Sequence, residues 1–238
     1  MTGKVFVRQD PWTGRRAAVK PVPEPLAAGL VHPHIVARRV VSAAGSVMDY
    51  VGPDLRAVLA SGLPPLPQAV AWMRQLLSAL SYLHGQDIVH RDIKPANLLL
   101  ADDGTVRLAD FGLACRVGDP VHDNVHGGTP NYMSPEQMRG APAAPVHDLY
   151  SAAVVFYQLL TGSLPRSGTA FEVVQQALCG KVPPPSALRP ELPPALDCLL
   201  EKALAPDLVQ RFSTAEAFLL ALEAFPCADP QQKSSGKK

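Results

Sequence analysis

The segment 90–100, HRDIKPANLLL, places three polar side chains close together before an apolar run. It carries a carboxylate at Asp92, an ammonium at Lys94 and an amide at Asn97, and a second carboxylate, Asp110, follows in VRLADFG. A carboxylate can accept a hydroxyl proton, and Asn and Asp oxygens suit a hard cation such as Mg²⁺. Together with a nearby ammonium, these groups indicate phosphoryl transfer, in which positioning and charge neutralisation supply most of the catalysis.

The composition limits the classes of protein that can carry these groups. The chain has 238 residues, of which 47% are hydrophobic, and a formal net charge of +1. This length suits one large domain or two lobes that share a cleft, and the apolar content excludes a largely disordered chain. The near-neutral charge gives no electrostatic reason to expect a nucleic acid or an anionic membrane as partner.

The cysteines and the longest apolar run predict a reduced, cytoplasmic protein. Cys115, Cys179, Cys198 and Cys227 show no CxxC spacing, and no apolar signal segment stands at the N-terminus. We therefore expect unpaired thiols. The apolar run 149–160 is too short to span a bilayer and predicts a buried core helix.

The first fifty residues favour β-structure. The runs 4–7 and 15–20 flank the turn sequence DPWTG, which predicts a hairpin. A second β-leaning run extends over 40–51. These elements would place a small β-rich part ahead of the polar residues at 92–97.

Beyond Gly52 the periodicity becomes helical. Short strands are expected at 98–100 and 106–110, separated by the turn sequence ADDG, and from Pro145 onward the chain is predicted to be helical up to a polar tail. The helix that leads into the segment at 90 is indicated by apolar residues at helical spacing: Val70, Met73, Leu76, Leu77, Leu80 and Leu83.

In order and spacing, HRDIKPAN, DFG and GTPNYMSPEQ resemble the motifs of the protein kinase family, specifically the eukaryotic-like serine/threonine protein kinases of bacteria. The resemblance covers nearly all of residues 3–222. It implies an α+β, bilobal fold with a reduced β-rich N-lobe over 1–51, a helical C-lobe over 52–225 and a polar tail over 226–238. The activity that it implies is transfer of the γ-phosphate of ATP, with Mg²⁺, to Ser or Thr of protein substrates.

The resemblance also implies roles for the polar residues. Asp92 would be the catalytic base, Lys94 would contact the transferred phosphate, and Asn97 with Asp110 would hold magnesium. Lys94 together with Thr129 is the family's mark of serine/threonine specificity. The nucleotide site would comprise Val5, Ala18, Lys20, Met48 as gatekeeper, the backbone of Asp49 and Val51, Leu99 and Asp110.

Further residues would support the site. The resemblance implies an ion pair between Glu136 and Arg211, and a role for Asp148 in bracing the catalytic loop through backbone amides. Five side chains are expected to pack and not to react: His90, Phe111, Trp72, Cys179 and Cys198.

Two departures from the family pattern affect the N-lobe. Only Gly3, Lys4 and Val5 match the glycine-rich loop, and two explanations stay open: the rest of the loop lies upstream of a late start, or the loop has degenerated. Between Lys20 and the HPHIV segment, three prolines exclude the several-turn helix whose Glu pairs with the Lys. Glu24 is the available acid, in a displaced register, so Lys20 is expected to lack a fixed partner. Nucleotide binding is therefore expected to be weak and turnover slow.

The loop of the activation segment lacks the hydroxyl groups that regulatory phosphorylation requires, and two alternative functions stay open. Residues 113–128 contain no Ser, Thr or Tyr, so activity should not depend on phosphorylation there; Asp119 or Asp123 is a candidate partner for Arg91. A pseudokinase scaffold and a small-molecule phosphotransferase are alternatives to an active protein kinase. The GTPNYMSPEQ segment, which resembles a peptide-holding shelf, argues against the second.

Overall fold

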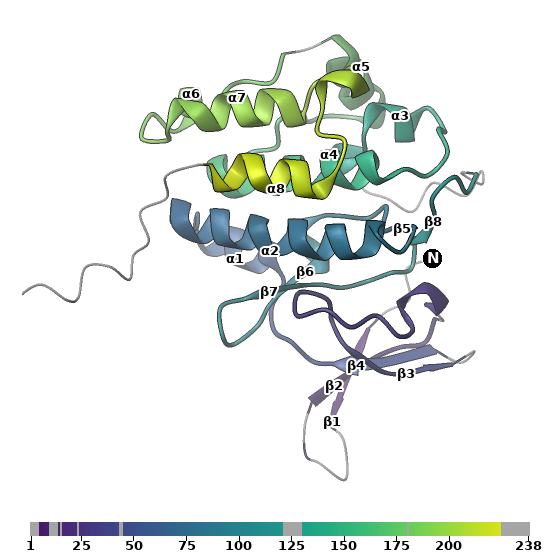
Figure 1. The fold of residues 1–238 in the computed structure, drawn as a ribbon. Helices are drawn as coiled ribbons and strands as arrows, with labels where there is room; N and C mark the ends of the chain where they lie inside the picture. Colours follow the sequence, from purple (N-terminus) through teal and green to yellow (C-terminus); the bar gives the residue numbers. More distant parts are fainter. Residues whose placement is uncertain are drawn as a thin grey trace, which may run out of the picture.

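The computed structural model describes residues 5–9, 14, 16–22, 24–42, 45–120, 130–179 and 181–224. A small antiparallel sheet from the first fifty residues lies against a larger helical part, as Figure 1 shows, with the sheet below and the helices above. The predicted α+β arrangement of a β-rich part followed by a helical part is therefore confirmed.

The sheet has four strands in the order β1-β2-β4-β3. The predicted hairpin is formed by β1 (Phe6–Gln9) and β2 (Arg16–Lys20), although most of its turn lies outside the described residues. The β-leaning run predicted over 40–51 contributes to two antiparallel strands, β3 (Arg38–Ser42) and β4 (Gly45–Asp49). Gly45, the first residue of β4, has a φ of 138°, a conformation that L side chains rarely adopt.

Between β2 and β3, the described residues contain only a three-residue 3₁₀ helix, η1 (Pro25–Ala27). Pro25 occupies the first position of this turn, where a missing amide hydrogen costs nothing, and the prolines on its N-terminal side prevent a longer helix. The prediction that no several-turn helix forms here is confirmed.

The helical part is organised around α2 (Leu66–His84) and α4 (Pro145–Thr161). The apolar stripe predicted for α2 is buried, and α4 is buried along almost its whole length, as expected of a core helix. Gly162 ends α4 in a left-handed conformation, with φ of 75°. The other helices are α1 (Leu55–Ser61), α3 (Pro135–Met138), α5 (Ala170–Cys179), α6 (Pro185–Leu188), α7 (Pro194–Ala203) and α8 (Ala215–Glu223), with short 3₁₀ turns η2 (Pro95–Asn97), η4 (Pro130–Tyr132) and η5 (Leu208–Gln210).

One packing prediction was wrong. Cys198 is exposed, because α7 turns Leu196, Leu199 and Leu200 toward the core and leaves position 198 on the opposite side. Trp72 is buried as predicted, and its indole N–H donates to the carbonyl of Gly104 at 3.0 Å. Within the part of the chain that the structure describes, no helix has the length and apolar character needed to cross a membrane.

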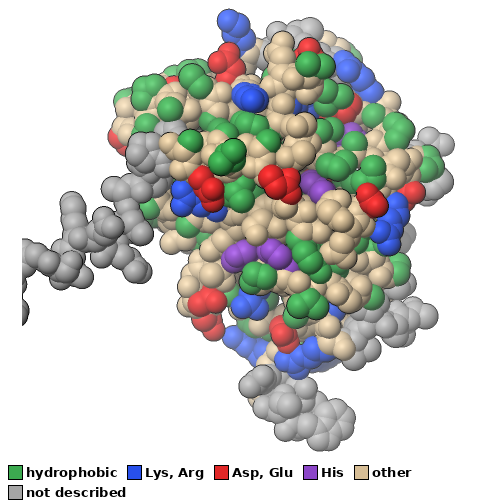
Figure 2. Space-filling model, viewed as in Figure 1, with side chains coloured by type: hydrophobic (Ala, Val, Ile, Leu, Met, Phe, Trp, Pro, Cys, Tyr) green, Lys and Arg blue, Asp and Glu red, His purple; other side chains and the backbone are tan. Residues whose placement is uncertain are grey.

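Histidine side chains gather where the sheet and the helical part meet on the face shown in Figure 2. The His32 ring stacks on Tyr82 of α2, with 5.1 Å between ring centroids, and His32 Nε2 lies 3.2 Å from the hydroxyl of Ser78. The backbone of Ile35 also bridges to Leu108. The segment that precedes β3 therefore attaches the sheet to the helical part.

Two short antiparallel ladders bring the predicted functional segments together. β5 (Ile88–Val89) pairs with β8 (Cys115–Arg116), and β6 (Leu98–Leu100) pairs with β7 (Val106–Leu108). The loop between β5 and β6 carries the residues at 92–97, and the loop between β7 and β8 carries Asp110. These ladders place the two loops side by side.

Candidate active site

The loop between β5 and β6 brings Asp92, Lys94 and Asn97 into contact. Lys94 Nζ lies 2.8 Å from Asp92 Oδ1 and 2.7 Å from Oδ2. The Asn97 amide nitrogen donates to the Asp92 carbonyl at 2.7 Å and to Asp92 Oδ2 at 2.9 Å, which leaves Asn97 Oδ1 as the uncommitted acceptor. The Asp92 carboxylate is therefore held in one orientation by two side chains of the same loop.

Asp148 fixes the backbone of this loop from α4. Its two carboxylate oxygens accept hydrogen bonds from the amides of His90 and Arg91, both at 2.8 Å, and His84 Nε2 lies 2.9 Å from Oδ2. Burial alone would raise the pKa of Asp148, but the hydrogen bonds from His84 and the His90 amide hold it below its usual range. The predicted bracing contacts are present, and they support Arg91 in a left-handed conformation with φ of 65°.

His90 packs beneath the loop as predicted. It is fully buried, its ring meets Phe111 edge to face at 4.8 Å, and burial lowers its pKa, which favours the neutral ring. One ring nitrogen lies 3.0 Å from the carbonyl of Ala109, and the other accepts from the amide of Asp92 at 3.3 Å. Both nitrogens are thus engaged in the structure of the loop.

Asp110 lies next to Lys20. Lys20 Nζ donates to Asp110 Oδ1 at 2.5 Å, and the amide of Gly112 donates to the same oxygen at 3.1 Å. Burial would raise the pKa of Asp110 and lower that of Lys20, but their mutual hydrogen bond reverses both shifts, so the pKa of Asp110 is lowered and that of Lys20 is raised. Both groups are therefore charged at neutral pH.

The prediction that Lys20 lacks a fixed partner was wrong. Glu24 Oε1 lies 2.9 Å from Lys20 Nζ, and both side chains are almost completely buried. The pair forms because the chain turns directly after β2 and brings a residue four positions later back over the Lys. Arg38 of β3 contacts the other oxygen of Glu24. Motif matching did not identify Arg38.

Four of the residues predicted for the adenine slot pack in one apolar cluster. Ala18 of β2 lies opposite Met48 of β4, and both pack with Val36 and Ala109. Half-buried Val51 and Leu99 pack against the same cluster. Val5, immediately before β1, is exposed and stands outside it.

The segment 49–52, which leads from β4 toward α1, connects the sheet to the helical part and has two notable backbone features. Within the described residues, the amide and the carbonyl of Val51 have no hydrogen-bond partner, whereas the Asp49 amide donates to the carbonyl of Ala37 at 3.2 Å. A Cβ at Gly52 would lie 2.1 Å from the carbonyl oxygen of Leu100. The backbone at residue 52 therefore passes so close to the backbone of Leu100 that only glycine fits there.

Comparison with known proteins agrees with this geometry. The sequence model of the protein kinase domain matches residues 27–220. The chain belongs to the protein kinase family. Its kinase relatives include several bacterial serine/threonine-protein kinases.

PknL of Mycobacterium tuberculosis (strain ATCC 25618 / H37Rv), a serine/threonine-protein kinase, is 41% identical over 183 residues, which cover 75% of this chain and 46% of PknL. SCO3848 of Streptomyces coelicolor, a probable serine/threonine-protein kinase, is 36% identical over 259 aligned residues, covering 96% of this chain and 38% of the relative. PrkC of Bacillus subtilis is 35% identical over 175 residues, covering 71% and 27%. The chain thus spans less than half the length of these kinases.

The donor set of this kinase chain fits a divalent cation. The contacts of Asp110 within the described part of the chain both involve Oδ1, so Oδ2 is available as a ligand, as is Oδ1 of Asn97. The amide of Ala109, beside Asp110, donates to the carbonyl of Asn97 at 2.9 Å and ties the two loops together. Carboxylate and amide oxygens are suitable ligands for Mg²⁺, which the kinase family generally uses with ATP.

The activation segment is described up to residue 120 and again from 130. Arg91 Nη1 contacts the thiol of Cys115 at 3.7 Å, and Asp119 accepts from the amide of Arg116 at 2.8 Å. The suggestion that Asp119 pairs with Arg91 is therefore not supported by the contacts. Asp123 and Thr129 lie outside the described residues.

The predicted ion pair of the kinase C-lobe is present. Arg211 Nη1 lies 2.8 Å from Glu136 Oε1, and its other nitrogens donate to the carbonyls of Ala205 and Pro206 at 2.5 and 3.1 Å. Glu136 lies in α3, whose first turn is capped by Ser134. The pair therefore fixes the segment that follows the activation loop against the connection between α7 and α8.

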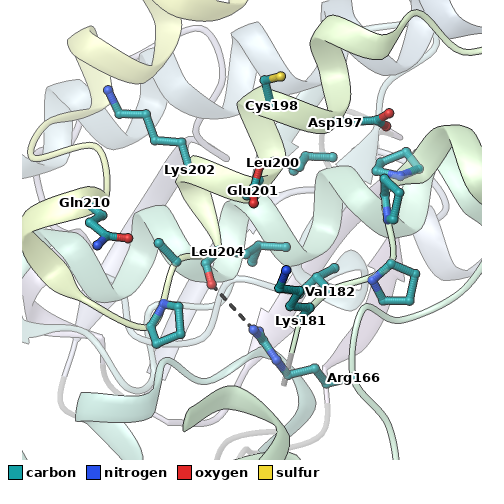
Figure 3. A pocket seen from close by; sticks show the side chains of 15 residues that line it. Arg166, Lys181, Val182, Asp197, Cys198, Leu200, Glu201, Lys202, Leu204 and Gln210 are labelled. Atoms are coloured by element: carbon teal, nitrogen blue, oxygen red, sulfur yellow. Dashed lines mark hydrogen bonds between the residues drawn. The ribbon is translucent and has the colours of Figure 1, made fainter. Parts of the chain in front are cut away.

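A cavity of about 610 Å³ lies elsewhere in the helical part (Figure 3). Its walls include Pro183, Glu201, Leu204 and buried Arg166, whose guanidinium donates to the carbonyl of Leu204 at 3.5 Å. None of the residues of the loop 90–97 lines it, so this cavity is separate from Asp92, Lys94 and Asn97.

Proposed function

We propose that this chain is a serine/threonine protein kinase that transfers the γ-phosphate of ATP to protein substrates in the cytoplasm. In this proposal residues 1–51 act as a reduced N-lobe and 52–225 as the C-lobe that holds the catalytic loop, followed by the tail 226–238. The observation that carries it is the joint placement of Asp92, Lys94 and Asn97 beside the Asp110–Lys20 pair.

Asp92 is the residue placed to accept a proton. Its carboxylate is oriented by Lys94 and Asn97, so it can receive the hydrogen of a Ser or Thr hydroxyl as that oxygen attacks the γ-phosphorus. The bond from phosphorus to the bridging oxygen of ADP breaks, and the electron pair leaves with ADP. Lys94 supplies positive charge beside the transferred group, where it lowers the barrier.

Asn97 and Asp110 would hold magnesium, and Lys20 would contact the α- and β-phosphates. When bound, the metal neutralises charge on the phosphate oxygens. For Lys20 to reach phosphates, its 2.5 Å contact with Asp110 has to lengthen, while Glu24 retains the ammonium. The adenine would lie among Ala18, Met48, Val51 and Leu99, with hydrogen bonds to the backbone of Asp49 and Val51.

Replacing Asp92 tests this function. With the 238-residue chain, labelled Mg-ATP and a generic protein substrate, Asp92→Asn should reduce turnover by a factor of about 100 to 10,000 while ATP affinity is nearly unchanged. Asp110→Asn should weaken magnesium-dependent ATP binding as well. Equal turnover of the wild type and Asp92→Asn would exclude the proposal.

The acceptor distinguishes the alternatives. Label on Ser or Thr of the protein supports a protein kinase, whereas label transferred only to small hydroxyl compounds indicates a small-molecule phosphotransferase. Nucleotide binding without any transfer indicates a pseudokinase scaffold.

A further inference from the structure

We infer that Arg38 is a positioning residue, which fixes Glu24, and through it Lys20, in place of a helix between β2 and β3. The inference rests on the proposed kinase function, because it concerns how Lys20 is held for the phosphates. It assigns a role to a side chain that belongs to none of the recognised motifs.

The contacts of Arg38 with Glu24 are close and buried. Arg38 Nη2 lies 2.5 Å and Nε 3.1 Å from Glu24 Oε2, while Glu24 Oε1 faces Lys20 Nζ at 2.9 Å. The exposed fractions of the Arg38 and Glu24 side chains are 2% and 0%. The two oxygens of Glu24 are thus divided between two cations, and rotation of the carboxylate would break both ion pairs.

Arg38 also has contacts that fix its own position. Its Nη1 donates to the carbonyl of Val36 at 3.2 Å, and its guanidinium carbon lies 4.8 Å from the centroid of the Phe111 ring. Phe111 directly follows Asp110, which would bind the metal. The Arg38 guanidinium therefore contacts Glu24, the partner of Lys20, and also the residue next to Asp110. Arg38 therefore couples the position of Lys20 to the position of the DFG segment.

The local sequence explains why such a residue is needed. Glu24 stands just before η1, a single 3₁₀ turn, and has no longer helix to restrict its backbone. Its charge is also buried, and a carboxylate paired with Lys20 alone would have to share that one cation with the phosphates of ATP. Arg38 gives Glu24 a second cation and keeps the carboxylate in place when Lys20 contacts phosphate.

Kinetics of two substitutions test the role. If Arg38 positions Lys20, Arg38→Met should lower kcat/KM for ATP by about a hundredfold, in line with the loss of one preorganised contact. Arg38→Lys, which keeps the charge but not the fork, should recover part of that loss. Arg8→Met, on strand β1 of the same sheet with an exposed side chain, is the matched control and should stay close to wild type.

A second readout does not depend on activity. Lys20 is almost completely buried, so an amine-specific reagent should label it slowly in the wild type, as measured by mass spectrometry of the Lys20 peptide. Arg38→Met and Glu24→Gln should each raise its labelling severalfold under conditions where circular dichroism shows a folded protein, and the double variant should add little more.

Turnover and Lys20 labelling together distinguish a failure of the kinase proposal from a failure of the inference about Arg38. If the wild type transfers no phosphate, the kinase proposal fails, and Lys20 labelling still decides the inference about Arg38. If the wild type transfers phosphate, and Arg38→Met matches it in both kcat/KM and Lys20 labelling, the inference is overturned. If Arg38→Met does not fold, the labelling of Glu24→Gln and Arg38→Lys decides, since unchanged labelling in both overturns it.

Discussion

The two halves of the active site are supported in opposite ways. In the helical part the catalytic loop is held from far along the chain: Asp148 is 58 residues from His90, and Arg211 is 75 residues from Glu136. In the sheet part the supports are local: Glu24 is four residues from Lys20 and 14 from Arg38. The catalytic loop therefore depends on tertiary packing, whereas the pairing of Lys20 with Glu24 depends on one turn and one strand.

This difference predicts how substitutions act. A change among the long-range supports should reduce both the free energy of unfolding and the activity, because the same contacts join helices and orient Asp92. A change among the local supports should reduce activity with a smaller effect on unfolding. The following four predictions are arranged from the largest expected effect to the smallest.

Asp148→Asn should have the largest effect. The amide cannot accept from two backbone N–H groups and His84 as the carboxylate does, and it is buried, so the free energy of unfolding should fall by about 3 kcal/mol. Turnover should fall as well, because the Arg91 backbone loses its anchor. Chemical denaturation measures the first effect, with exposed Asp102→Asn as the control expected to change stability by less than about 0.5 kcal/mol. Equal stability of the two variants would contradict the comparison.

Glu136→Gln should come next. It removes the charged partner of Arg211 but leaves the guanidinium its two backbone carbonyls, so a loss of about 2 kcal/mol in the free energy of unfolding is expected. The exposed pair of Arg189 and Glu191 offers a matched control, since Glu191→Gln should cost less than about 1 kcal/mol. A cost for Glu136→Gln no larger than the control would show that this long-range pair is dispensable.

Lowering the pH should reduce the free energy of unfolding, because the buried carboxylate of Asp148 in the helical part becomes protonated. Its pKa is lower in the folded protein than in the unfolded chain, so its contribution is complete above the unfolded value of about 3.9 and is lost as the pH falls through the folded value. Denaturation at several pH values below about 5 should show this loss. In Asp148→Asn that part of the pH dependence should be absent, and an unchanged profile would argue against the assignment.

Phosphatase treatment should leave turnover unchanged, which is the smallest of the four expected effects. The segment 113–128 has no hydroxyl to phosphorylate, and Arg91 contacts Cys115 instead. Turnover before and after treatment should agree, with mass spectrometry to locate any phosphate present. A loss of activity accompanied by loss of phosphate from this segment would refute the prediction.

Sequence reasoning succeeded where periodicity or motif spacing carries the information. The helix α2 follows from its apolar stripe, α4 from its apolar run, and the grouping of Asp92, Asn97 and Asp110 from motifs that two short ladders bring together. Cys198 was wrongly expected to pack, although the i, i+3, i+4 spacing of Leu196, Leu199 and Leu200 indicates a buried face that excludes it.

The support of Lys20 could not be predicted in the same way. Whether Glu24 reaches back to Lys20 depends on the path of a proline-rich turn, and no periodic pattern describes that path. The guanidinium of Arg38 is buried only because Glu24 and Phe111 surround it, and a strand pattern alone would place an arginine in solvent. Both features result from three-dimensional packing of residues that no local pattern connects.

The short η1 turn has a consequence for inhibitor design. In kinases whose Lys–Glu pair depends on a helix, the position of that helix controls whether the pair forms, and a displaced helix breaks it. Between Lys20 and Ile35, the described residues of this chain offer only a three-residue turn, and Glu24 is fastened to the sheet by Arg38. Compounds that require such a displaced helix should therefore spare this protein, and a selective ligand would have to use the apolar cluster around Ala18 and Met48 instead.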